Sequence, residues 1–137
     1  MATTHLAVEI AVPDEELAER LAERLVATGA AAGTRTSSGP SHYRWEGTVE
    51  RRVDWTVTAF TTRDRLDAVY DLVDDCHPDD LPGVTYRGVN AREEFRDWIE
   101  RNTGPDVGES DVIDDLPRPI ESDACESEVS ESDETSE

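Results

Sequence analysis

The stretch Tyr43-Arg44-Trp45-Glu46-Gly47-Thr48-Val49-Glu50 decides how the chain folds, because two extended segments meet there. The preceding segment, from about Ala30 to Arg44, is rich in Thr and Ser. The following segment, 53–60, alternates with a period of two and is rich in β-branched and aromatic residues, a pattern typical of a β-strand. Glu46-Gly47 can reverse the chain, because glycine tolerates a positive φ angle. The sequence therefore predicts a long β-hairpin whose turn is Glu46-Gly47.

The segment before the hairpin is predicted to form a strand and then a helix. Residues 6–12 place Leu, Val and Ile at alternate positions, which gives a strand with one apolar face. Asp14 can cap the following helix, in which leucines recur every four residues, and Gly29 can end it in a left-handed conformation. His5, at the start of the strand, is predicted to be exposed.

The segment after the hairpin is predicted to form a helix, a short strand and a last helix. Thr61 or Thr62 can cap the first of these helices. Residues 84–87 form the short strand, and Asn90 and Glu93 have the spacing of a capping box for the last helix.

The order strand, helix, strand, strand, helix, strand and extra helix predicts an α+β fold of the ferredoxin-like split βαβ type. In this fold a four-stranded antiparallel sheet carries both helices of the repeat on one face. The other face would expose apolar side chains, such as Trp55 and Val57 or their alternates, unless something covers it. Self-association of the chain is therefore expected.

The charge of the chain is strongly negative. Its formal net charge is −20, with 33 acidic residues against 13 basic ones, and all 13 are Arg. Because the acids are spread along the chain, this composition favours a halophilic protein of a salt-rich cytoplasm over a single cation site or a basic partner. No basic patch for nucleic acid, no membrane-spanning run and no signal peptide is recognised, so a cytoplasmic location is expected.

The composition divides the chain into a folded domain, 1–104, and an acidic tail, 105–137. Residues 121–137 are almost entirely Glu, Asp and Ser, and they cannot bury enough apolar surface to offset the entropy of ordering, so they are expected to be disordered. Residues 111–120 contain four larger apolar side chains and are a candidate for docking on the domain.

From Leu6 to Arg101 the chain resembles the CutA divalent-cation tolerance proteins. The hairpin stretch resembles the Tyr-x-Trp-x-Gly-x-aliphatic-Glu signature of that family, His77-Pro78 its His-Pro-Tyr, and Phe95 to Ile99 its Tyr-x-x-Trp-aliphatic helix. The chain departs from the family at Gly33, where a Cys is common, and at Asp79, which replaces the Tyr of His-Pro-Tyr.

The resemblance implies a non-enzymatic homotrimer in which each long hairpin reaches across to neighbouring protomers. The family is similar in fold and assembly to the PII-type signalling proteins. On this basis the expected subunit interface includes four residues of the hairpin: Tyr43, Trp45, Val49 and Trp55.

One cluster has the residue types of a metal site: Cys76, His77, Asp79 and Asp80. Together with ligands from a neighbouring subunit, it could hold a divalent metal ion such as copper or zinc. The alternative is a helix C-terminus with a buried Cys, a His near the helix dipole and two solvated Asp residues.

The hairpin carries further candidates. His42 could approach another subunit's cluster, and Glu46, Glu50 and Asp54 could form a ring of carboxylates around a trimer axis; both sets could equally be solvated side chains. No catalytic set is recognised in the sequence. Three functions stay open: a divalent-cation-binding trimer of copper tolerance, a PII-like trimer that binds a small ligand, and a structural interaction trimer.

Overall fold

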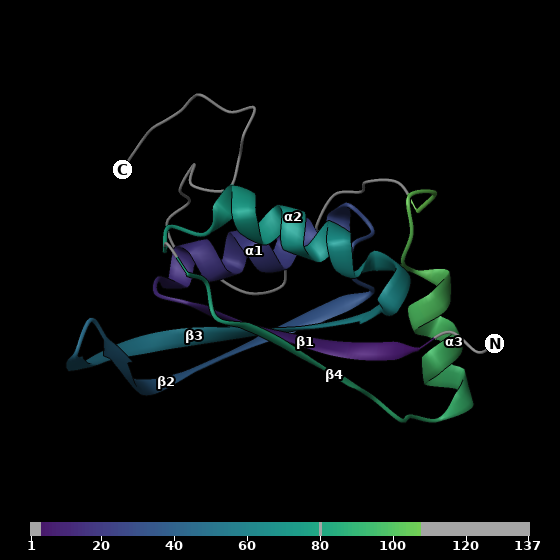
Figure 1. Ribbon diagram of the computed structural model, residues 1–137. Coiled ribbons are helices and arrows are strands. Elements are labelled where there is room, and N and C mark those ends of the chain that lie inside the picture. Colours follow the sequence, from purple (N-terminus) through teal and green to yellow (C-terminus); the bar gives the residue numbers. More distant parts are fainter. Residues whose placement is uncertain (1–3, 80, 108–137) are drawn as a thin grey trace, which may run out of the picture.

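The computed structural model describes residues 4–79 and 81–107, and within them it shows an α+β fold (Figure 1). A four-stranded sheet has the order β2-β3-β1-β4, and each pair of neighbouring strands is antiparallel. Figure 1 shows α1 and α2 together over one face of this sheet, which confirms the predicted architecture. The elements in chain order are β1 (His5–Val12), α1 (Glu15–Ala27), β2 (Gly33–Trp45), β3 (Thr48–Thr62), a 3-10 turn (Arg63–Arg65), α2 (Leu66–Cys76), β4 (Val84–Gly88) and α3 (Glu93–Arg101).

The hairpin turns where the sequence predicts. Trp45 pairs with Thr48, so Glu46 and Gly47 are the only residues between the strands. Their φ angles are 49° and 85°, and two consecutive positive φ angles are the mark of a type I′ turn, which matches the twist of a hairpin. The second strand is longer than the predicted 53–60, and the first begins at Gly33 rather than at Ala30.

The distal half of the hairpin extends beyond the rest of the sheet. Strand β1 pairs with β3 only as far as the pair Val12 and Trp55, whereas β2 and β3 stay paired to the turn. Residues 39–54, called the hairpin arm below, are therefore two-stranded, and Figure 1 shows the tip of the arm beyond the ends of α1 and α2.

The core lies between the sheet and the two helices. Its side chains come from alternate residues of β1 and β3 and from the inner faces of α1 and α2. The fully buried members include Val8, Ile10, Leu21, Leu25, Val57, Val69 and Val73. Val57 thus faces the helices, and Trp55 is partly buried against the same core.

The opposite face of the sheet is partly covered by α3. Phe60, which alternates with the core-facing Ala59, contacts Phe95 of α3 with 5.9 Å between ring centroids. Self-association was expected because nothing within one chain was predicted to cover this face, and that reason is wrong at the end of the sheet that α3 occupies.

The N-terminal cap and the C-terminal glycine of α1 form as predicted. The amide of Leu17 donates to a carboxylate oxygen of Asp14 at 2.9 Å, and Gly29 follows the helix with a φ angle of 81°. Thr28 stands between the last helical residue and Gly29, so the glycine has the position just past the cap that favours a left-handed conformation.

Three local predictions are wrong, two of them because a distant contact engages the side chain. Thr61 does not cap α2: its hydroxyl donates to the carbonyl oxygen of Ala30 at 2.6 Å, and Thr62 makes no capping hydrogen bond. Helix α3 begins after Arg92 without a side-chain cap, so the Asn90 and Glu93 capping box does not form. His5 is buried, with 7% of its surface exposed, and its Nε2 lies 2.7 Å from a carboxylate oxygen of Glu100.

Candidate functional site

His77, the central residue of the predicted metal cluster, uses both ring nitrogens within its own chain. Its Nε2 lies 2.5 Å from the carbonyl oxygen of Ala11, and its Nδ1 lies 3.1 Å from the amide nitrogen of Asp79. Because a carbonyl can only accept and an amide can only donate, Nε2 carries the proton and Nδ1 accepts. The side chain is 1% exposed, so these two bonds satisfy a buried imidazole and tie the end of α2 to β1.

Only part of the predicted cluster can be followed beyond His77 and Asp79. Cys76 is buried as the last residue of α2, and Asp80 lies outside the described residues. Over residues 4–79 and 81–107, no group of three or more His, Cys, Asp or Glu side chains is placed to hold a metal ion. Cys76, His77 and Asp79 therefore form no metal site by themselves, and the four-residue cluster that includes Asp80 stays a prediction.

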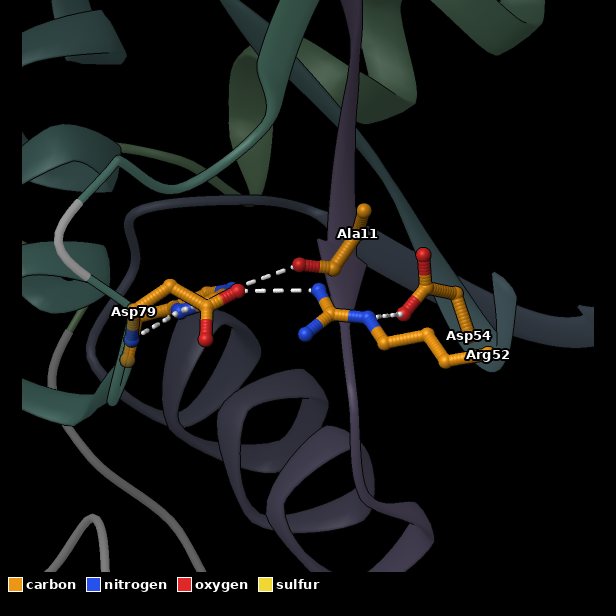
Figure 2. A network of polar contacts seen from close by, with 5 residues as sticks. Ala11, Arg52, Asp54 and Asp79 are labelled. Atoms are coloured by element: carbon orange, nitrogen blue, oxygen red, sulfur yellow. Dashed lines mark hydrogen bonds and ion pairs between the residues drawn. The ribbon is translucent and has the colours of Figure 1, made fainter. Parts of the chain in front are cut away.

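Asp79 instead belongs to a polar network that the sequence did not reveal. Arg52 donates from Nε to Asp54 at 2.6 Å and from Nη2 to Asp79 at 2.9 Å, as Figure 2 shows. The guanidinium carbon of Arg52 also lies 5.4 Å from the ring centroid of Tyr43. One arginine thus joins the hairpin arm to the connection between α2 and β4.

The network keeps Arg52 charged. The hydrogen bond to Asp79 raises the pKa of Arg52, partial burial opposes this rise, and the hydrogen bond and charge of Asp54 reinforce it. An arginine already stays protonated at any physiological pH. Arg52 is therefore a permanent cation between two carboxylates.

The network lies in a cleft between the hairpin arm and the α2–β4 connection. The cleft has a volume of about 570 Å³, within the range of small-molecule sites. Arg52, Asp54 and Asp79 form part of its lining, together with the side chains of Tyr43, Trp45 and Pro78. The aromatic residues of the hairpin and the His-Pro segment were both recognised in the sequence, and both line this cleft. The sequence therefore indicated some of the lining residues, but not that they lie together.

The four residues predicted for a subunit interface differ in exposure. Trp45 is 42% exposed and Val49, next to the turn, is 60% exposed. Tyr43 is half-buried beneath Arg52, and Trp55 packs partly against the core of its own chain. Trp45 and Val49 are therefore available to another chain, while Tyr43 and Trp55 already have contacts within this one.

Gly33, where the CutA proteins often have a Cys, faces the aromatic side chains of α3. A Cβ atom at Gly33 would lie 2.9 Å from Cη2 of Trp98, a distance that real Cβ atoms almost never show. Trp98 is in turn stacked on Phe95 with 5.2 Å between ring centroids. This packing leaves no room for a thiol at Gly33 unless the indole moves.

Residues 6–102 match the CutA1 divalent ion tolerance protein family. The chain belongs to the CutA1 family. Among solved structures, the divalent cation tolerance protein of Thermus thermophilus is 29% identical, with a TM-score of 0.71 over 73% of this chain and 99% of that one. CutA from Archaeoglobus fulgidus, described as a periplasmic divalent cation tolerance protein, is 28% identical, with a TM-score of 0.69 over 72% of this chain and 97% of that one.

CutA from Synechococcus elongatus is also 28% identical, with a TM-score of 0.69 over 76% of this CutA1-family chain and 93% of that one. No curated protein sequence matches the chain significantly. Among the residues that the structure describes, no helix is both long enough and apolar enough to cross a membrane.

Proposed function

We propose that this CutA1-family chain is a non-enzymatic homotrimer of divalent-cation tolerance, which binds a cation such as copper or zinc where its subunits meet. The observation that supports the proposal is the hairpin arm. The arm extends past the last pair between β1 and β3, and it has large apolar side chains on its surface. The predicted cytoplasmic location and halophilic character belong to the same proposal.

The physical argument for assembly is that an isolated two-stranded ribbon is at best marginally stable in water. Within the arm, β2 stays paired with β3 from Gly39 to Trp45 with no break, and contacts with another chain would stabilise this outer ribbon. Val49 near the tip and Val53 near the base of the arm are exposed in the single chain, and contact with neighbouring copies would bury them. A closed trimer is the assembly that the resemblance implies.

The proposed cation site depends on which potential metal ligands are not already bonded to other groups of the chain. His77 is fully hydrogen-bonded, and Asp54 and Asp79 are bound to Arg52. On the arm, His42, Glu46 and Glu50 are exposed. Imidazole and carboxylate groups of this kind bind copper and zinc, and a threefold assembly would bring copies of them together.

Light scattering and calorimetry on the full chain test this proposal. In molar salt, light scattering is expected to give three chain masses, and titration with Cu²⁺ or Zn²⁺ to give saturable heat. Glu50→Gln should weaken the metal binding, whereas Asp71→Asn, the same type of charge removal on the exposed side of α2, should not. A monomer, or metal binding equally weakened by both variants, would contradict the proposal.

The runner-up functions are a PII-like trimer that binds a small ligand and a structural interaction trimer. The cleft beside Arg52 is the observation that favours a small ligand.

A further inference from the structure

Within the cleft between the hairpin arm and the α2–β4 connection, the network of Arg52, Asp54 and Asp79 has an uneven charge. Two carboxylates, Asp54 and Asp79, face the single guanidinium of Arg52, so one negative charge is not compensated within the network. Asp54 is only 8% exposed, which places part of this charge in a poorly solvated position. A poorly solvated negative charge favours the approach of a cation.

Arg44 is the second positively charged residue that lines the cleft, but it does not neutralise this negative charge at close range. Arg44 is exposed, and its Nη1 lies 3.5 Å from the carbonyl oxygen of Gly47 in the hairpin turn. Its guanidinium therefore contacts the hairpin turn and is solvated. Charge on an exposed side chain is screened by water and salt far more than charge on a buried one such as Asp54.

Aromatic side chains in the same cleft add a second attraction for cations. The ring of Tyr43 already accepts a cation on its face, namely the guanidinium of Arg52 at 5.4 Å. Trp45 also lines the cleft and is partly exposed in the single chain. Indole faces attract ammonium and guanidinium groups more strongly than other aromatic rings do.

We propose that this cleft is a binding site for a small organic cation, an amine or a guanidine with a short aliphatic body. The cationic head lies against Asp79 and Asp54, and the aliphatic body packs on Trp45 and Pro78. The volume of about 570 Å³ accommodates such a molecule. At low ionic strength, the net charge of −20 on the chain also attracts cations toward the protein.

This site goes beyond the proposed binding of a metal ion. It uses the floor of the cleft within one chain, whereas the proposed metal ligands lie on the outer part of the arm. The two proposals can therefore fail separately, provided that the organic cation is titrated in the presence of a chelator and the metal is titrated without the organic cation.

Titration of the full chain with agmatine, which carries a guanidinium and an ammonium group, tests the proposal. Calorimetry and tryptophan fluorescence in the presence of EDTA should show saturable binding. Asp79→Asn keeps the shape of the side chain but removes the floor charge, and it should weaken binding at least about tenfold. Asp71→Asn, on the exposed side of α2, removes the same charge outside the cleft and should leave the affinity unchanged.

A second pair of variants tests whether Trp45 contributes to ligand binding rather than only to folding. Trp45→Leu should weaken agmatine binding several-fold, whereas Phe95→Leu changes an exposed aromatic residue on α3, remote from the cleft, and should not. Circular dichroism checks that each variant is folded. The proposal is overturned if agmatine, spermidine and choline all fail to bind below about 10 mM. It is also overturned if Asp71→Asn weakens binding as much as Asp79→Asn.

Discussion

Gly33 lies against the indole ring of Trp98, so closely that a Cβ atom at Gly33 would be 2.9 Å from Cη2 of the ring. The contact joins the start of β2 to α3, two elements far apart in the sequence. It also gives a physical reason why Gly33, at a position where CutA proteins often have a Cys, has no side chain. In this chain an aromatic ring occupies the space that the thiol would need.

Gly33→Ala is expected to destabilise the protein by about 1–3 kcal/mol, because the added methyl group overpacks the contact with Trp98. Gly88→Ala is the matched control: Gly88 is also a strand residue without a positive φ angle, and nothing lies within 4 Å of its Cβ position. Chemical denaturation at one fixed protein concentration measures both. Equal stability of the two variants would show that the indole moves away without cost.

The imidazole of His77 is expected to be structural. His77→Ala should destabilise the fold by about 2–4 kcal/mol, since it leaves the buried carbonyl oxygen of Ala11 without its donor and creates a void. His42→Ala, on the exposed arm, is the control and should change stability by less than about 0.5 kcal/mol.

Nitrogen NMR of the His77 ring separates this role from metal binding. The spectrum should show the proton on Nε2 and should not shift when Zn²⁺ is added. A Zn²⁺-dependent shift of the His77 nitrogens would instead support the metal cluster predicted from the sequence.

The hairpin arm is expected to carry the assembly. Val49→Asp places a charge at an exposed position next to the turn, so it should leave the fold of one chain intact but disrupt contacts with neighbouring copies. Val26→Asp, at a partly exposed position on α1, is the matched control and should leave the assembly intact. Light scattering measures the mass of each variant. An unchanged mass for Val49→Asp would mean that the tip of the arm is not buried between subunits.

Local sequence signals predict local structure well in this chain. Asp14 caps α1, Gly29 follows it with a positive φ angle, and Glu46-Gly47 forms the hairpin turn, because in each case the determining residues are neighbours in the sequence. The element order was also sufficient to predict the sheet, since the split βαβ pattern has few compact solutions.

Contacts between distant residues account for what the sequence did not predict. The burial of His5 depends on Glu100, 95 positions away, and the network of Arg52 depends on Asp79, 27 positions away. The spacing of Cys76, His77 and Asp79 did not indicate that His77 would hydrogen-bond to Ala11. It also did not indicate that Asp79 would bind Arg52. The predicted ligand Asp80 and the tail beyond residue 107 lie outside the described residues, so those predictions stay open.

The network of Arg52 is expected to stabilise the protein independently of pH in the neutral and alkaline range. A group whose pKa is raised on folding stabilises the fold fully below its unfolded pKa, and this contribution is lost only as the pH rises through the folded pKa. For Arg52 the folded pKa lies above its ordinary value, which is already strongly alkaline, so the loss lies beyond the usual working range. Arg52→Gln should therefore cost about 0.5–1.5 kcal/mol, because the network is partly solvated, and the difference from the parent should be the same at about pH 7 and pH 10. Denaturation at the two pH values measures it, and a difference that shrinks at the higher pH would contradict the assignment of Arg52 as a permanent cation.

The salt dependence of stability is the last expectation. With a net charge of −20, the folded chain holds its carboxylates closer together than the unfolded chain does, and an assembly would concentrate them further. Raising KCl from about 0.1 M to about 1 M shortens the Debye length from about 10 Å to about 3 Å, which screens this repulsion. We therefore expect the melting temperature to rise with KCl, most steeply at the low end of the range. Sucrose at matched osmolality is the control, because it stabilises proteins through exclusion from their surface without screening charge. A melting temperature that does not change with KCl, or that rises equally with sucrose, would remove the reason for calling this acidic chain halophilic.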